Sequence, residues 1–461
     1  MEVNDYLVIA MFVTFIALLF TGFPVAWVLA GVGVIFCAVG YFADLYLDTL
    51  TGLDFLTLGL VVNRLYKIMD NWILVALPMF IFMGLMLDQS GIAVRMMRSM
   101  QSLFGGLRGG LAITVTSIGI ILAASTGIIG ASVVLLGLLS LKPMLDQGYN
   151  RPLALGTIAG AGTLGILIPP SIMLVIMADQ VGVSVGDLFM GAVFPGLILG
   201  GLYIAYIIIV GLIRPAAAPL PQDAEPLSFG VVLEVIKSVI PPVLLIIAVL
   251  GSIFAGVATA TEASGVGALG AILLAIFNRR FSLPILKEVS LATFNTTAYI
   301  FAIFIGATCF SLVLRELGGD DLIERTLTAL PFGSYGIVFA ILFIVFLLGF
   351  ILDWIEITLI ILPLMAPVIS GLDLGIEGFG EIDNPDLIWF LILVAVTLQT
   401  SFLTPPVGFA LFYLKGVCPP DVRLFEIYKG VVPFIILQLI GLTLVVTYPT
   451  LATWLPAVAY N

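Results

Sequence analysis

Four short segments interrupt the apolar runs of this sequence with proline, glycine, hydroxyl or acidic residues. Two of them contain a proline pair, Pro169-Pro170 in GTLGILIPPSI and Pro405-Pro406 in LQTSFLTPPVG. The other two read AASTGIIGAS and GFILDWIEIT. A proline pair removes two backbone donors and stops a helix. Because the carbonyls released in this way need partners in an apolar environment, these segments suit a hard cation such as Na⁺.

The same breaks create helix ends inside the apolar runs. The N-terminus of a half-helix carries a partial positive charge and free N–H groups, which can hold a carboxylate. One kind of break therefore offers both a cation site and an anion site. A single proline pair is more typical of a structural kink, whereas two pairs at matching places favour a functional role.

Acidic residues within or beside the apolar runs have two possible roles. Asp353 and Glu356 lie in the segment GFILDWIEIT. Acids at membrane depth are functional candidates by default. The alternative is that this segment reaches water at one end. Glu262, in the segment TATEAS, is open between capping a helix and a functional role.

The elements that carry these breaks are predicted to be membrane-spanning helices. Of the 461 residues, 61% are hydrophobic and 10% are charged, against about 25% charged residues in soluble domains. Runs of ~20 apolar residues can cross a bilayer as helices, and their continuous apolar character argues against barrel strands. The predicted spans are 7–20, 22–42, 72–88, 152–178, 190–213, 237–254, 258–277, 293–314, 387–413 and 430–449.

Composition also excludes several classes of function. A formal charge of −11 argues against a nucleic-acid partner. The chain has no histidine and only three scattered cysteines, which excludes imidazole metal ligands, a His-based triad and a CxxC metal site. No enzyme motif of the GxSxG kind is present, so an intramembrane enzyme is a weak alternative. We expect no cofactor other than Na⁺ as a coupling ion.

The charges of the loops predict the topology. Two apolar stretches, 109–142 and 333–369, are too long for one crossing, and we interpret both as re-entrant hairpins. Of the 17 Lys and Arg residues, 13 then share one side, which the positive-inside rule makes cytoplasmic. The other side holds Arg64, Lys67, Arg315 and Arg325. Both termini are then predicted to be periplasmic.

The two halves of the chain resemble each other. The proline pairs lie 236 positions apart, and GFPVAWVLAGVG from Gly22 is answered by GVATATEASGVG from Gly256. We predict an inverted repeat, 1–213 and 237–461, joined by a cytoplasmic connector at 214–236. Each half has five spans and one hairpin, with broken spans at 152–178 and 387–413. Such a pattern is typical of secondary transporters that bind their substrate near the bilayer midplane.

Several motifs in order resemble the large (M) membrane subunit of tripartite ATP-independent periplasmic (TRAP) transporters. They are GFPVAWVLAG, LPMFIFMGLML, GTLGILIPPSI, VGDLFMGAVFPGLIL, TATEAS and LQTSFLTPPVGFALFYLKG. The resemblance implies an all-α polytopic protein of elevator-type ion-transporter architecture in the bacterial inner membrane. It also implies Na⁺-coupled import of a carboxylate such as a C4-dicarboxylate, a small four-helix membrane subunit and a periplasmic substrate-binding protein. The runner-up is a self-sufficient Na⁺/carboxylate symporter that needs neither partner.

The resemblance further implies two Na⁺ sites, each made from a hairpin tip and a broken span. The expected cation-binding residues are Ser125, Thr126, Gly127, Gly162, Thr163, Gly165, Pro169, Gly349, Asp353, Glu356, Thr400, Ser401, Thr404 and Pro405. The expected substrate-binding residues are Ser132, Pro170, Ser171, Pro406 and Gly408.

Overall fold

The computed structural model describes residues 3–47, 49–126, 129–221, 228–376 and 384–459, and it shows only the helix backbone for 123–126. Within these ranges the chain forms helices and no strand. Nine helical segments in them are long and apolar enough to cross a membrane. The predicted all-α polytopic architecture is therefore confirmed.

The first half contains ten helices within the described residues. They are α1 (Val3–Leu19), α2 (Val25–Tyr46), α3 (Phe55–Met69), α4 (Ala76–Gln89), α5 (Ile92–Phe104), α6 (Gly110–Thr126), α7 (Ile129–Asp146), α8 (Arg151–Thr163), α9 (Ile172–Val181) and α10 (Val185–Ile213). Short 3₁₀ turns lie at Trp72–Val75 and Leu164–Ile166, and another follows α10 at Pro215–Ala217.

The second half follows a similar order. Its helices are α11 (Phe229–Phe254), α12 (Ala260–Phe277), α13 (Leu283–Glu316), α14 (Gly319–Thr328), α15 (Ser334–Leu348), α16 (Trp354–Glu356), α17 (Leu362–Ser370), α18 (Pro385–Leu403), α19 (Phe409–Val417), α20 (Leu424–Thr447) and α21 (Thr450–Ala459). A π-helical segment, Ile357–Ile361, joins α16 to α17. That the two halves insert in opposite directions stays a prediction.

Four helices, α3, α5, α14 and α21, lie outside both the predicted spans and the predicted hairpins. α3, α5 and α14 each have an apolar face and a polar face, so a search for continuous apolar runs does not detect them. The two halves of the chain also differ in the region of α3. α3 and α4 together match α13 in length, but the first pair is interrupted at Asp70 and Asn71, whereas α13 is continuous.

Two details of the sequence interpretation are settled here. The sequence has two further proline pairs, Pro241-Pro242 and Pro419-Pro420. α11 continues through Pro241-Pro242, so a proline pair does not by itself end a helix. Glu262 caps α12: its Oε2 accepts a hydrogen bond from Thr259 N at 2.8 Å, and Thr259 Oγ1 accepts from Glu262 N at 3.3 Å. The capping role for Glu262 is therefore the one that the structure shows.

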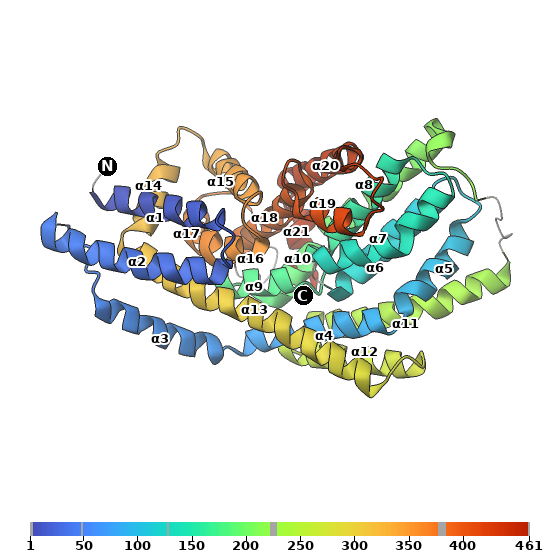
Figure 1. Cartoon of the computed structure of the whole chain (residues 1–461), viewed down its shortest axis with the longest axis horizontal. Coiled ribbons are helices and arrows are strands. Elements are labelled where there is room, and N and C mark those ends of the chain that lie inside the picture. The colour runs from blue at the N-terminus through green and yellow to red at the C-terminus, as the bar shows by residue number, and fades with distance from the viewer. Residues whose placement is uncertain (1–2, 48, 127–128, 222–227, 377–383, 460–461) are drawn as a thin grey trace.

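The helices form two groups (Figure 1). α2, α3, α4, α11, α12 and α13 run along one edge of the molecule, and the broken helices with α10, α15 and α20 lie beside them. In the first group the halves exchange partners, because α2 packs on α13 and α12 packs on α4. Glycine permits this close approach: a Cβ at Gly306 would lie 2.4 Å from Ala26 O, and one at Gly33 would lie 2.9 Å from Cys309 Sγ.

The second group has the two broken spans at its centre. Every residue of α18 from Leu387 to Leu403 is buried, as is every residue of α8 from Leu153 to Thr163. α8 packs on α20, while α18 packs on α10, α15 and α20. The polar atoms of both breaks are therefore held by surrounding protein as well as by their own helices.

Candidate ion and substrate site

The first break lies between α8 and α9 and is buried throughout. α8 ends at Thr163, and α9 begins only at Ile172, after Pro169 and Pro170, whose shared peptide bond is cis. Ser171 Oγ donates to Ile166 O at 2.6 Å, which fixes the chain as it enters α9. The predicted residues Gly165, Pro169, Pro170 and Ser171 thus lie together in one buried segment between the helices, and Gly162 lies in the last turn of α8.

The second break, between α18 and α19, is more open. α18 ends at Leu403, and α19 begins at Phe409 after the cis Pro405-Pro406 bond. Pro405 is half-buried and Pro406 is exposed. Gly408 adopts a φ of +49°, a left-handed conformation that suits glycine. The chain therefore turns into α19 at a less enclosed place than the first break.

Hydroxyl groups line the end of α18. Thr400 Oγ1 donates to Val396 O at 2.8 Å, and Thr404 Oγ1 donates to Thr400 O at 2.7 Å. A hydroxyl that donates its proton to a carbonyl keeps two lone pairs, so both oxygens stay able to bind a cation. Ser401 Oγ points elsewhere and donates to Phe346 O of α15 at 2.8 Å.

The turn after α15 packs directly onto this end of α18. A Cβ at Gly349 would lie 2.6 Å from Ser401 Oγ, so only glycine lets the turn come this close. Asp353 begins α16, and its Oδ1 accepts from Trp354 N at 2.8 Å. Glu356 is 1% exposed, and no hydrogen-bond partner of its Oε2 is found among the described residues. The structure therefore brings Gly349 into contact with Ser401 and places the half-buried Asp353 and the buried Glu356 in the same turn region.

A π-helical segment follows Glu356 at once. Such segments are rare, and they are frequent at functional sites because they displace side chains from their regular helical positions. Nothing in the sequence marked this feature.

The first hairpin is described only in part. Ser125, Thr126 and Gly127, which were predicted as its cation ligands, lie outside the residues whose side chains are described. Its return helix α7 packs tightly on the first break, since a Cβ at Gly162 would lie 2.4 Å from Val133 Cγ2. Ser132, predicted to contact substrate, is 4% exposed on this helix.

Tyr413 of α19 connects the two hairpins. A Cβ at Gly130, in α7, would lie 3.0 Å from the Tyr413 ring. Tyr413 is also close enough to Asp353 to interact with it electrostatically. The two hairpin regions, which lie more than 200 residues apart in the sequence, thus approach the same side chain.

The two breaks touch through equivalent residues. Gln399 Nε2 donates to Thr163 Oγ1 at 3.3 Å, and the two residues lie 236 positions apart, the spacing of the proline pairs. Gln438 Nε2 of α20 donates to the same oxygen at 3.4 Å, and Thr163 Oγ1 donates to Gly160 O at 2.9 Å. Thr163 is therefore a junction between the halves.

Sequence reasoning did not assign the two amides of this junction. Gln399 is noticeable in retrospect because it matches Thr163 in the other half. Gln438 is an isolated polar residue in the apolar helix α20. Both are fully buried, and their Oε1 atoms have no hydrogen-bond partner among the described residues.

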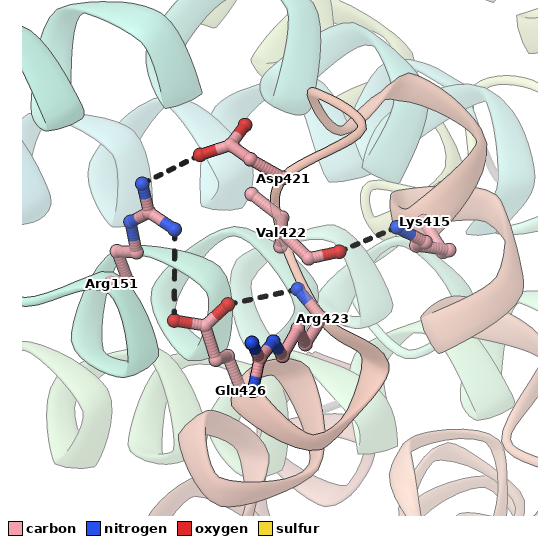
Figure 2. A network of polar contacts seen from close by, with 6 residues as sticks. All are labelled: Arg151, Lys415, Asp421, Val422, Arg423 and Glu426. Atoms are coloured by element: carbon pink, nitrogen blue, oxygen red, sulfur yellow. Dashed lines mark hydrogen bonds and ion pairs between the residues drawn. The ribbon is translucent and has the colours of Figure 1, made fainter.

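The start of α8 is tied to the loop after α19 and to the first turn of α20 (Figure 2). Arg151 Nη2 lies 2.6 Å from Asp421 Oδ2, and Arg151 Nη1 lies 3.8 Å from Glu426 Oε1. Glu426 Oε2 in turn accepts from Arg423 N at 2.8 Å. These side chains are partly exposed, so each ion pair contributes up to about 1 kcal/mol. The two broken spans are thus joined near their middles and at one end.

Comparisons with known proteins find one family along nearly the whole chain. The family model for the tripartite ATP-independent periplasmic transporter, DctM component, matches residues 12–451. The large permease protein DctM of a C4-dicarboxylate TRAP transporter from Vibrio cholerae is 30% identical over 84% of this chain and 86% of its own. The sialic acid TRAP large permease SiaM of the same organism is 28% identical, over 96% of both chains.

One further relative and one solved structure extend the comparison. The ectoine TRAP large permease TeaC of Halomonas elongata is 26% identical over 98% of this chain and 99% of its own. Among solved structures, the Alcanivorax borkumensis YdaH transporter superposes with a TM-score of 0.57 at 13% identity, covering 84% of this chain and 85% of that one, which shows a shared fold. The chain is a member of the TRAP transporter family, a multi-pass inner-membrane large permease (DctM) component and not an enzyme.

Proposed function

We propose that this chain imports a small carboxylate with Na⁺ as the coupling ion. The observation that supports this most is the pairing of the two breaks, which meet at Thr163 and Gln399 and each pack against a hairpin through glycine. Such a centre offers carbonyl and hydroxyl oxygens to a cation and half-helix N-termini to a carboxylate. The oxygens are neutral except at Asp353 and Glu356, whose charge a bound cation would compensate.

The carboxylate class rests on the relatives. The names of the three relatives refer to a C4-dicarboxylate, sialic acid and ectoine. These molecules differ in size and in net charge, but each carries a carboxylate. The recognition element common to these three molecules is therefore the carboxylate.

The proposal includes two sites and two partners. One Na⁺ is bound by the first hairpin tip with Gly162–Pro169, and the other by Gly349–Glu356 with Thr400–Pro405. A small four-helix membrane subunit and a periplasmic binding protein complete the transporter, and the second group of helices moves as a unit relative to the first. Both termini lie in the periplasm, and 214–236 lies in the cytoplasm.

The experiment reconstitutes the chain with its small subunit in liposomes and adds the binding protein outside. Uptake of succinate, sialic acid and ectoine is measured with a Na⁺ gradient alone and with a pH gradient alone. We expect uptake of one of them with the Na⁺ gradient only. Equal uptake with protons and no Na⁺ would refute Na⁺ coupling, and full uptake without either partner protein would favour the self-sufficient symporter.

A further inference from the structure

A cavity of about 530 Å³ lies between the two groups of helices, apart from the breaks described above. α3 and α13 form its walls on one side, and the end of α9 and the second hairpin form the other. Its volume falls within the ~300–1,000 Å³ usual for sites that bind small molecules. The cavity is therefore large enough to hold a small organic anion.

Three basic side chains line this cavity. Arg64 and Lys67 come from the last turns of α3, and Arg315 comes from the last turn of α13. They are three of the four Lys and Arg residues on the side predicted to be periplasmic; Arg325 is the fourth. On a side that otherwise avoids basic residues, their convergence on one cavity calls for an explanation beyond topology.

Two of these three basic side chains have no ion-pair partner in the part of the chain that the structure describes. No ion pair joins Arg64 or Lys67 to a described acidic residue, and Arg315 Nε lies 3.4 Å from Asp320 Oδ2 in a half-exposed pair. One carboxylate, Asp179, is among the described lining residues. Its Oδ1 accepts a hydrogen bond from Asn71 Nδ2, and its Oδ2 accepts one from Gln180 Nε2 at 2.9 Å. Both oxygens of this carboxylate are therefore hydrogen-bonded to side-chain amides.

The cavity also borders the segment that carries the proposed site. Leu359, in the π-helical segment, and Pro363 are among its lining residues. Leu359 is three residues from Glu356. On the α13 wall, Thr308, Ser311 and Arg315 follow one another at helical spacing and present two hydroxyls and a guanidinium to the same space.

We propose that this cavity is an outer anion-binding site, in which Arg64, Lys67 and Arg315 hold the carboxylate group of a solute before it reaches the broken helices. Cations that line a confined space raise the local concentration of an anion and speed its capture. The role in import rests on the proposed carboxylate transport, whereas the binding of an anion does not. An anionic lipid headgroup shares the same chemistry and is the competing occupant.

The charge of the cavity can be measured without knowledge of the substrate. A cysteine at Ser311 is allowed to react with an anionic reagent, sulfonatoethyl methanethiosulfonate, and with a cationic one, trimethylammonioethyl methanethiosulfonate, each added from the periplasmic side. The reference is a cysteine at Gly333, an exposed position where a Cβ meets no atom within 4 Å. We expect the anionic-to-cationic rate ratio to be higher at Ser311 than at Gly333.

Charge-changing variants then test the named residues in the Ser311→Cys chain. Arg64→Gln with Lys67→Gln should lower the ratio about ten-fold at low ionic strength, and less at physiological salt because of screening. Arg64→Lys with Lys67→Arg keeps both charges and should keep the ratio. Arg325→Gln removes the basic residue that does not line the cavity and should also leave it unchanged. An unchanged ratio in the Gln double variant would overturn the proposal.

Protection from modification identifies the occupant. Succinate should slow the reaction at Ser311→Cys in phosphatidylcholine liposomes, and the protection should be lost in the Gln double variant. Slowing by phosphatidylglycerol, with no effect of succinate, would show a lipid site and refute the carboxylate site. If ratio and protection hold while no Na⁺-driven uptake of any carboxylate is found, the anion site stands and the proposed transport function fails.

Discussion

Replacing Thr404 with valine removes one hydroxyl from the second break and changes the volume of the side chain little. In the structure, Thr404 Oγ1 donates to Thr400 O at 2.7 Å, and its lone pairs face no described donor in the hydrogen-bond network. If those lone pairs bind Na⁺, their loss costs ~1.5–3 kcal/mol, as for other contacts with a charged group. This corresponds to a fall in Na⁺ affinity of roughly 10–100-fold.

The assay is a Na⁺ titration of uptake in proteoliposomes, normalised to folded protein. Thr447→Val is the matched control, because Thr447 Oγ1 donates to Thr443 O over the same 2.7 Å but lies at the exposed end of α20. Loss of that bond alone should leave the half-saturating Na⁺ concentration unchanged. If Thr404→Val also leaves it unchanged, the hydroxyl is not a ligand, and backbone carbonyls of the break are the better candidates.

Three further outcomes are expected. If the two halves are inverted, a cysteine replacing Glu324 in α14 should react with an impermeant thiol reagent added from the periplasm. A cysteine replacing Arg98 in α5 should react only after the membrane is permeabilised. Labelling of both cysteines from one side would contradict the inversion. Gly162→Ala should lower the free energy of unfolding by about 1–3 kcal/mol, because the added Cβ would clash with α7. Gly201→Ala in α10, where a Cβ meets nothing within 4 Å, should leave the free energy of unfolding unchanged. Similar melting temperatures of the two variants would refute the packing argument. Burial raises the pKa of Cys418 to about 11, so alkylation of this thiol should be slow at pH 7.5 and should accelerate as the pH rises towards that value; fast labelling at neutral pH would contradict this.

The sequence reveals the breaks because their signals are local. Glycine and hydroxyl residues surround Pro169 and Pro405 at the ends of α8 and α18, whereas Pro241, which has Ser238 but no glycine nearby, lies within a continuous helix. The contact of Gln438 with Thr163 depends on how α20 packs on α8, and no local pattern encodes it.

The amphipathic helices show a second limit. α3 carries Arg64 and Lys67 on one face and apolar residues on another. Hydropathy averaged along the chain therefore detects neither the apolar face nor the basic one. The cavity basic residues were visible only as exceptions to the charge bias of the loops. Their shared location follows from the packing of α3 and α13 against α9 and the second hairpin, which the sequence alone does not specify.

The unbroken length of α13 has a consequence for the bilayer around the protein. Its 34 residues extend about 51 Å at 1.5 Å per residue, whereas a bilayer measures ~40–45 Å including its headgroups. α13 must therefore tilt or protrude, and a thinner membrane requires a larger tilt. The corresponding stretch in the first half can bend at Asp70 and Asn71 instead. Lipids of different chain length should thus strain the two halves unequally, and the acyl composition of the membrane becomes a variable that shifts one half relative to the other.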